Sequence, residues 1–277
     1  MIGQIIKVKK SFCEVKLDKE IKSCVVRGNV KKMRPVVGDL VEIDKDGAIS
    51  LILPRNSYFI RPSCANVDIV NVVVASVPKP DFLVVDRLIA MAINGGAGVI
   101  ITVNKSDISS DVADYVLANY QNAVDKIFVV SAEKNTGLQE LKNYLQGKLV
   151  VFAGQSAVGK TSIINGIFGE NFRVGEVSKK TQRGKNTTTS STIVESDNVR
   201  LMDTPGFTSL YALNIKQEDL KNCYREFYGK QCYFVDCLHN LEPDCGVKLS
   251  VENKEISQDR YNRYLTILKE IKEQKYE

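Results

Sequence analysis

A glycine-rich segment between an apolar run and a helical pattern constrains the fold of this chain most strongly. Residues 154–161 read Gly-Gln-Ser-Ala-Val-Gly-Lys-Thr, which matches the phosphate-loop pattern G-x4-G-K-S/T. The apolar run 149–153 precedes the segment, and helical spacing begins at Thr161. A phosphate loop needs a strand that leads into a helix N-terminus, so the segment predicts a layered α/β domain. A coincidental glycine turn is the alternative.

The residue types of this segment indicate its chemistry. Glycines let the backbone curl so that several N–H groups face the phosphates of a nucleotide. Lys160 would reach the β- and γ-phosphates, and the Thr161 hydroxyl would ligate Mg²⁺. The expected nucleotide contacts are Gly154, Gln155, Ser156, Ala157, Val158, Gly159, Lys160, Thr161 and Ser162.

Apolar runs alternate with helical patterns along the middle of the chain. Continuous apolar runs of this kind are typical of strands in a parallel sheet that helices cover on both faces. We therefore expect a parallel sheet between two helical layers. The expected strands are 68–77, 98–103, 126–130, 149–153 and 199–202, and helical spacing covers 112–120, 137–145 and 161–168.

The sequence Asp-Thr-Pro-Gly at 203–206 closes the last of these strands. A carboxylate at the carboxyl end of a strand beside a phosphate loop can hold Mg²⁺ through water, which is the role we expect for Asp203. The N–H of Gly206 would meet the γ-phosphate. Taken alone the tetrapeptide is an ordinary turn, and its position 43 residues after Lys160 favours the site.

A polar, basic stretch at 181–189 lies between these two motifs and has no apolar periodicity. It ends in three consecutive threonines, and we expect Thr188 to complete the Mg²⁺ coordination while a γ-phosphate is present. A hydroxyl-rich linker is the alternative interpretation.

Asn104-Lys-Ser-Asp107 follows the expected strand 98–103. The Asp107 carboxylate can accept two hydrogen bonds from the N1–H and exocyclic amine of guanine, which adenine does not offer. Ser131 and Ala132 follow the next strand and would supply a backbone N–H to the guanine carbonyl. The expected base-reading residues are Asn104, Lys105, Asp107, Ser131 and Ala132, and a loop that caps the next helix is the alternative.

These motifs are the elements of a GTPase in a permuted order. The guanine-reading segment precedes the phosphate loop here, whereas the usual order begins with the phosphate loop. Circular permutation leaves each motif at the carboxyl end of its own strand, where open α/β sheets bind ligands. It also attaches the C-terminal residues directly after the Asp203 segment.

Three cysteines and the single histidine of the chain lie within 14 residues of one another near the C-terminus. Their spacing, Cys-x4-Cys-x-His-x5-Cys, suits a tetrahedral structural zinc site. Buried free cysteines with an incidental histidine are the alternative. The expected ligands of one Zn²⁺ are Cys232, Cys237, His239 and Cys245, followed by a helical pattern at 261–271.

The first 60 or so residues contain short runs rich in Val, Ile and Phe between turn signals, which predict a small closed barrel of about five strands. Residues 1–34 contain ten Lys or Arg and three Asp or Glu, whereas the whole chain has a formal net charge of +5. This concentration of charge favours a polyanionic partner for the barrel, and a solvated lysine-rich face is the alternative.

The composition excludes several classes of protein. Of 277 residues, 44% are hydrophobic and 26% are charged, which is the range of globular proteins. No apolar run approaches the roughly 18 residues that a membrane span needs, and the N-terminus lacks the apolar core of a secretion signal. We expect a cytoplasmic protein without membrane contact.

Together these residues resemble a known family, the circularly permuted, ribosome small-subunit-dependent GTPase A of bacteria. The resemblance also includes Val37-Gly38-Asp39, Arg55, Arg61-Pro62 and Ala65-Asn66-Val67-Asp68 at the end of the barrel. It implies a multidomain α/β protein: an N-terminal OB-fold β-barrel at 1–62, a circularly permuted P-loop GTPase domain at 63–214 and a C-terminal helical zinc-binding domain at 215–277.

The resemblance also implies an activity and partners. Members of the family hydrolyse GTP slowly alone and faster on the small (30S) ribosomal subunit, late in its maturation, and leave after hydrolysis. We therefore expect a monomeric GTPase that uses GTP and GDP with Mg²⁺, carries one structural Zn²⁺ and binds the small subunit and its rRNA. The rival functions are an rRNA-binding scaffold with incidental hydrolysis and a GTPase of tRNA modification or translation.

One position departs from the family pattern. The family commonly has Gly-x-His-Thr-Thr-Thr, in which the histidine is a proposed catalytic residue, and this chain has Asn186 there. Phe207 follows Gly206, so the glutamine that orients water in Ras-type enzymes is also missing. An amide can orient water but is no base near neutral pH, so we expect the ribosomal subunit to supply or order the missing group. The expected catalytic residues are Lys160, Asn186, Thr188 and Gly206.

Overall fold

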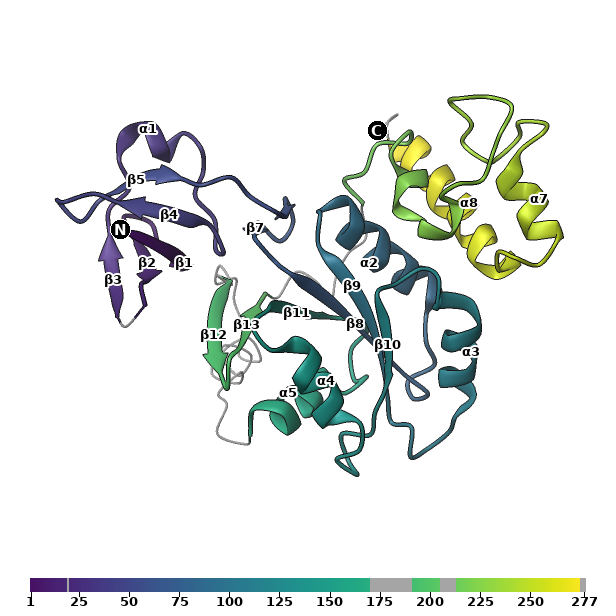
Figure 1. Cartoon of the computed structure of the whole chain (residues 1–277), viewed down its shortest axis with the longest axis horizontal. Coiled ribbons are helices and arrows are strands. Elements are labelled where there is room, and N and C mark those ends of the chain that lie inside the picture. Colours follow the sequence, from purple (N-terminus) through teal and green to yellow (C-terminus); the bar gives the residue numbers. More distant parts are fainter. Residues whose placement is uncertain (19, 170–190, 205–212, 275–277) are drawn as a thin grey trace.

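A computed structural model describes residues 1–18, 20–169, 191–204 and 213–274 of the protein. In these residues eleven strands form one hydrogen-bonded sheet, in the order β10-β9-β8-β11-β13-β12-β1-β2-β3 with β4 and β5 attached beside β1. Figure 1 shows that this sheet runs from an α/β layer into a separate N-terminal barrel, while a helical C-terminal module lies on the other side of the molecule.

The N-terminal barrel consists of β1 (Ile2–Val8), β2 (Cys13–Lys16), β3 (Ile21–Cys24), β4 (Leu40–Ile43) and β5 (Ile49–Ile52), with the short helix α1 (Gly28–Lys31) after β3. β1 pairs with both β2 and β4, and a bridge between Val26 and Ile49 closes the circle. Alternate side chains such as those of Ile5 and Val15 fill its interior. The predicted barrel is confirmed.

A hairpin of β6 (Tyr58–Phe59) and β7 (Cys64–Ala65) links the barrel to the α/β layer. Gly38 packs on this hairpin with a φ of +96°, and a Cβ there would lie 1.9 Å from the carbonyl oxygen of Ala65. The next residue, Asp39, is fully buried and accepts a hydrogen bond from Arg55 Nε at 2.7 Å. Asn66 Nδ2 donates to the Gly38 carbonyl at 2.9 Å. Gly38, Asp39, Arg55 and Asn66, which the sequence patterns singled out, therefore hold the hairpin against the end of the barrel.

The central sheet is parallel. Its strands lie in the order β10 (Lys126–Val129), β9 (Gly98–Asn104), β8 (Ile69–Ala75), β11 (Leu149–Ala153) and β13 (Val199–Asp203). Every residue of β8 and of β11 is buried, as expected for strands covered on both faces. The predicted parallel sheet is confirmed.

One strand of the sheet, β12 (Thr192–Ser196), is not among the expected strands and runs antiparallel to β13. Only Ile193 of β12 is buried, so the strand lacks the continuous apolar run that identifies its neighbours. On its other edge β12 meets β1 of the barrel, where Thr192 lies opposite Lys7. β12 therefore joins the barrel to the central sheet.

Helices cover both faces of the parallel sheet, as predicted. On one face, α2 (Phe82–Asn94) and α3 (Asp111–Tyr120) contribute Leu88 and Val116 to the core. On the other face, α4 (Leu138–Leu145) and α5 (Lys160–Phe168) contribute Leu141 and Ile163 to a second core. Asp81 caps α2, since its carboxylate accepts hydrogen bonds from the first backbone N–H groups of that helix.

The C-terminal module consists of two short 3-10 helices, η2 (Leu220–Cys223) and η3 (Arg225–Phe227), followed by α7 (Gly246–Glu252) and α8 (Gln258–Gln274). Its core contains Tyr224, Phe227 and Tyr264, whose rings contact one another. α8 packs beside α2 (Figure 1). The predicted domain boundaries remain predictions. Within the described ranges, no helix is long and apolar enough to cross a membrane.

Candidate nucleotide and metal sites

The predicted nucleotide residues lie at the carboxyl ends of neighbouring parallel strands. Asn104 ends β9, the phosphate loop begins at Gly154 directly after β11, and Asp203 ends β13. Because β9, β8, β11 and β13 are adjacent in the sheet, these ends share one edge (Figure 1). The structure thus brings the guanine-reading segment beside the phosphate loop although their order along the chain is permuted.

Two glycines shape the phosphate loop. Gly154 has a φ of +130° and Gly159 a φ of +95°, a region that other residues rarely adopt. A Cβ at Gly154 would lie 2.3 Å from the carbonyl oxygen of Val73, and a Cβ at Gly159 would lie 2.2 Å from Asn104 Nδ2. The loop therefore packs directly on β8 and on the guanine-reading segment, an approach that only glycine permits.

Lys160 begins α5, and its side chain lies over the phosphate loop. Its Nζ donates hydrogen bonds to the carbonyl oxygens of Gly154 at 2.8 Å and Gln155 at 2.7 Å. Burial lowers the pKa of Lys160. The ammonium group is held beside the backbone that would surround a β-phosphate, so phosphate oxygens can replace the two carbonyl oxygens as its acceptors.

The oxygen donors expected for Mg²⁺ lie at the same edge. Thr161 is exposed in the first turn of α5, and Asp203 is partly buried at the end of β13. Burial raises the pKa of Asp203, because a charged carboxylate is penalised where water is excluded. A divalent cation would offset that penalty, and hydroxyl and carboxylate oxygens are ligands that Mg²⁺ prefers. The donor set therefore fits the ion.

The rest of the phosphate loop offers mostly exposed residues. Val158 is buried, and the side-chain oxygen of Gln155 accepts a hydrogen bond from the Asp81 N–H at 2.9 Å. Ser156, Ala157 and Ser162 are exposed around the loop. Asn186, Thr188 and Gly206, which are predicted for catalysis, Mg²⁺ and the γ-phosphate, lie outside the described residues.

Asn104 connects the two recognition loops. Its side chain is buried, Nδ2 donates to the Val158 carbonyl at 2.9 Å, and Oδ1 accepts from the Ala132 N–H at 3.0 Å. Lys105 extends the connection, since its Nζ donates to the carbonyl oxygens of Val77 at 2.7 Å and Ala157 at 3.0 Å. Both side chains thus hold the phosphate loop in place, a positioning role that the sequence pattern does not reveal.

Asp107 is exposed at this edge and is paired with Ser131. Its carboxylate accepts a hydrogen bond from the Ser131 hydroxyl, which is the main reason that the pKa of Asp107 is lowered. An ionised Asp107 could accept the two hydrogen bonds that are predicted from guanine. The Ser131 N–H donates to Thr136, and the Ala132 N–H is the one bound by Asn104, so donation to the guanine carbonyl remains a prediction.

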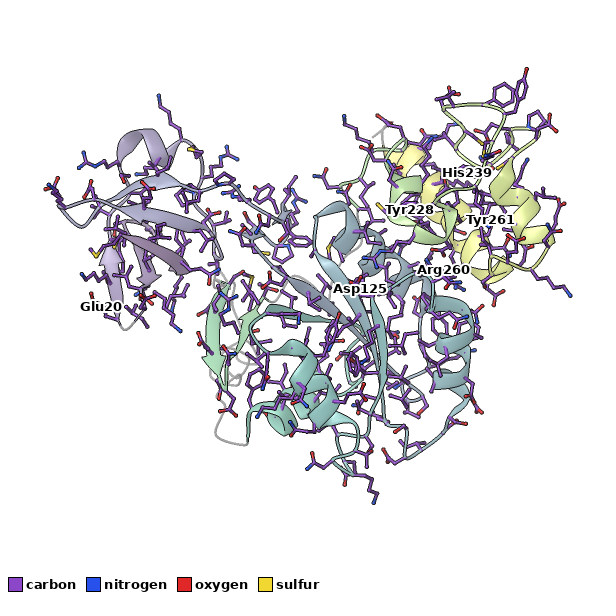
Figure 2. All side chains as sticks on the ribbon, in the orientation of Figure 1. Glu20, Asp125, Tyr228, His239, Arg260 and Tyr261 are labelled. Carbon is purple, nitrogen blue, oxygen red and sulfur yellow. The ribbon has the colours of Figure 1, made fainter. Side chains whose placement is uncertain are left out.

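The three cysteines and the histidine come together in the C-terminal module. The potential ligand atoms of Cys232, Cys237, His239 and Cys245 all lie within 4.8 Å of one another. His239 Nδ1 is 3.5 Å from Cys232 Sγ and 3.4 Å from Cys245 Sγ. Such separations fit four soft donors around one tetrahedral Zn²⁺. Figure 2 shows His239 among the loops that precede α7.

Surrounding groups fix this cluster. Tyr261 donates its hydroxyl hydrogen to the His239 carbonyl at 2.7 Å, and Glu242 accepts from two backbone N–H groups nearby, both at 2.8 Å. A Cβ on Gly246 would lie 2.2 Å from the carbonyl oxygen of Gln231, so glycine is required beside Cys245. Burial lowers the pKa of His239 and keeps the imidazole neutral, the form that binds metal. The residues therefore fit a structural zinc ion.

Two family models match the chain. The RsgA N-terminal domain matches residues 2–49, and the RsgA GTPase model matches residues 52–213. This chain belongs to the RsgA GTPase family. The family models end at residue 213 and do not include the Cys/His cluster, which the sequence spacing predicts and the structure brings together.

Relatives that match over nearly the whole chain belong to the same family. Proteins named small ribosomal subunit biogenesis GTPase RsgA are 38% identical in Alkaliphilus metalliredigens, over 98% of this chain and 97% of the relative, and 37% identical in Agathobacter rectalis, over all of both chains. The crystal structure of YjeQ from Thermotoga maritima superposes with a TM-score of 0.84 at 31% identity and covers 98% of each chain. YloQ, described as a circularly permuted GTPase, gives 0.80 at 29% identity over 99% of this chain and 95% of YloQ.

Membership of the RsgA GTPase family confirms the predicted fold class and circular permutation. It also makes the chain a GTPase, whose nucleotides are GTP and GDP with Mg²⁺. The roles of single residues are not decided by these similarities and remain proposals.

Proposed function

We propose that this chain is a GTP hydrolase that acts in late maturation of the small (30S) ribosomal subunit, binds the rRNA of that subunit and hydrolyses GTP faster when bound to it. The observation that carries the proposal is full-length similarity to relatives named for small ribosomal subunit biogenesis. The joined phosphate loop and guanine-reading segment support it from the structure.

In the proposed reaction Asp107 selects guanine, and Lys160 stabilises negative charge on the β- and γ-phosphates. Mg²⁺, when bound, supplies charge neutralisation at the phosphoryl oxygens. Its expected ligands are Thr161 and Thr188, with Asp203 acting through water. The N–H of Gly206 would respond to the presence of the γ-phosphate.

The attacking water lacks an obvious base in this chain. Asn186 is an amide, which can orient water but does not take its proton at neutral pH. Phosphoryl transfer depends mostly on positioning and charge stabilisation, so slow hydrolysis by the isolated protein is still expected. We propose that the bound subunit orders Asn186 or contributes the missing group.

The barrel is the proposed rRNA-binding surface. Its exposed cations would contact phosphates without reading sequence, so binding should weaken as salt concentration rises. We also propose that the protein is a monomer and acts in the cytoplasm, where ribosomal subunits mature. The exposed cations described in the barrel are Lys9, Lys10, Arg27, Lys31, Lys32, Arg34 and Lys45.

Co-sedimentation with purified small subunits tests the proposal. The protein should sediment with the subunits in a non-hydrolysable GTP analogue and be released in GDP. Equal recovery with both nucleotides, or none with either, would contradict it. Recovery of tRNA instead of small-subunit rRNA with the GTP-bound protein would favour the rival function in tRNA modification.

A further inference from the structure

Two loops beside the Cys/His cluster expose large apolar side chains. Among the described residues, the three most exposed large hydrophobic side chains are Val235 at 100%, Leu241 at 87% and Tyr233 at 78%. Phe234 lies next to them at 40% exposure. We call these four residues the apolar tip. Single exposed apolar residues are common, but a group of this kind on one small module marks an interaction site.

The cluster closes both loops that carry the apolar tip. Residues 233–236 lie between Cys232 and Cys237, and residues 240–244 lie between His239 and Cys245. The Tyr233 N–H donates to the Asp244 carbonyl at 3.1 Å, which holds the two loops side by side. An apolar surface that is already ordered loses little conformational entropy when a partner binds.

The two loops that carry the apolar tip are acidic, and Lys221 lies at their base, where its Nζ donates to the Cys237 carbonyl at 3.0 Å. Residues 231–245 contain Asp236, Glu242 and Asp244 and no Lys or Arg, and both aspartates are exposed. RNA phosphates would be repelled by this surface, whereas the basic barrel suits them. A protein surface with an apolar pocket and a rim of Lys or Arg is complementary to it in both respects.

We propose that the apolar tip docks into an apolar pocket with a basic rim on a protein of the small ribosomal subunit. This rests on the proposed function and adds a second contact of different chemistry. Figure 1 places the loops before α7 at the end of the molecule farthest from the barrel. The protein thus carries a surface for RNA at one end and a surface for protein at the other.

Alanine variants of the tip test the inference. Tyr233→Ala, Val235→Ala and Leu241→Ala should each weaken binding to purified small subunits by about tenfold, because each variant removes apolar surface that the proposed pocket would bury. Their zinc content and intrinsic GTP turnover should equal those of the wild type. Leu117→Ala, which truncates a 43% exposed side chain on α3, is the matched control and should bind normally.

Charge reversal separates a protein partner from an RNA partner. Asp236→Lys with Asp244→Lys should weaken binding to the subunit but not to protein-free small-subunit rRNA, and a photoreactive amino acid at position 235 should cross-link to a ribosomal protein. Tighter binding to the subunit after charge reversal, or a cross-link to rRNA, would overturn the inference.

Binding of the wild type to small subunits distinguishes a failure of the proposed function from a failure of the docking inference. If it fails to bind subunits at all, the proposed function falls together with the inference. If it binds and the tip variants bind equally well, only the docking inference is overturned.

Discussion

At the scale of single residues, the predicted nucleotide site at the carboxyl ends of the parallel strands depends on glycines as much as on the side chains that face them. Gly159 combines a positive φ with a close approach of Asn104, whose Nδ2 lies 2.2 Å from the position that a Cβ would take. The same Asn104 holds Val158 and Ala132, so a displacement at this point moves both recognition loops.

Gly159→Ala should therefore abolish high-affinity nucleotide binding, with at least a tenfold loss for GDP in a fluorescence titration. The new methyl group would overlap Asn104 Nδ2, in addition to the backbone strain of about 1 kcal/mol. Gly47→Ala is the matched control, because Gly47 has a φ of +81° but open space around it. Equal affinities of the two variants would contradict the packing argument.

Asp107→Asn should exchange the preference of the protein from GTP to xanthosine triphosphate. An amide at position 107 can still accept the Ser131 hydrogen bond, so the loop should keep its shape. The amide nitrogen, however, would donate to the base, which suits the second carbonyl of xanthine instead of the exocyclic amine of guanine. Competition binding with the two nucleotides measures this. An unchanged preference for GTP would remove Asp107 from the guanine-reading site.

At the scale of elements, the C-terminal module is fixed to the α/β layer by buried charge. The fully buried carboxylate of Asp86 on α2 accepts hydrogen bonds from Arg260 and Arg263 on α8. Arg260 also pairs with Glu226 and lies over the Tyr120 ring of α3. Figure 2 shows Arg260 where α8 meets the α/β layer.

Asp86→Ala should lower the free energy of unfolding by about 3–5 kcal/mol, because it removes the buried carboxylate shared by the buried Arg260 and the partly exposed Arg263. Glu273→Gln removes one partner of the exposed pair with Lys269 and should cost less than about 0.5 kcal/mol. Urea unfolding of both variants measures the difference. A loss below about 1 kcal/mol for Asp86→Ala would show that the ion pairs of Asp86 with Arg260 and Arg263 do not hold the C-terminal module on the α/β layer.

Cys237→Ser should remove stoichiometric zinc and loosen the C-terminal module, because a small core of this kind depends on its metal. Cys223→Ser is the control: Cys223 is buried in the same core but lies outside the cluster, so that variant should keep its zinc. Metal analysis of the purified variants decides. Full zinc content in Cys237→Ser would refute the four-ligand site.

The elements differ in how far the sequence predicts them. Strands such as β8 and β11 are apolar at nearly every position, and the phosphate loop has a fixed spacing, so both are recognisable locally. β12 has one buried residue and is defined by its partners β13 and β1. The charge cluster joins Asp86 to Arg260 across 174 residues, and no local pattern marks that pairing.

At the scale of the whole molecule, the barrel and the helical module lie next to the two segments that are proposed to respond to nucleotide, 181–189 and the one that follows Asp203. The barrel pairs with β12, which follows the threonine-rich segment, and the helical module follows the Asp203 segment. Lys16 of the barrel also pairs with Glu195 on β12. If either segment changes conformation on GTP hydrolysis, the module attached to it is placed to respond, which would offer a route for release from the subunit.

GTP turnover measured with and without purified small subunits tests whether the subunit activates hydrolysis. We expect slow turnover by the isolated protein, at least a tenfold increase on the subunit, and a smaller increase for Asn186→Ala than for the wild type or Asn186→His. Equal turnover with and without subunits would contradict it, because hydrolysis would then be incidental to a scaffold.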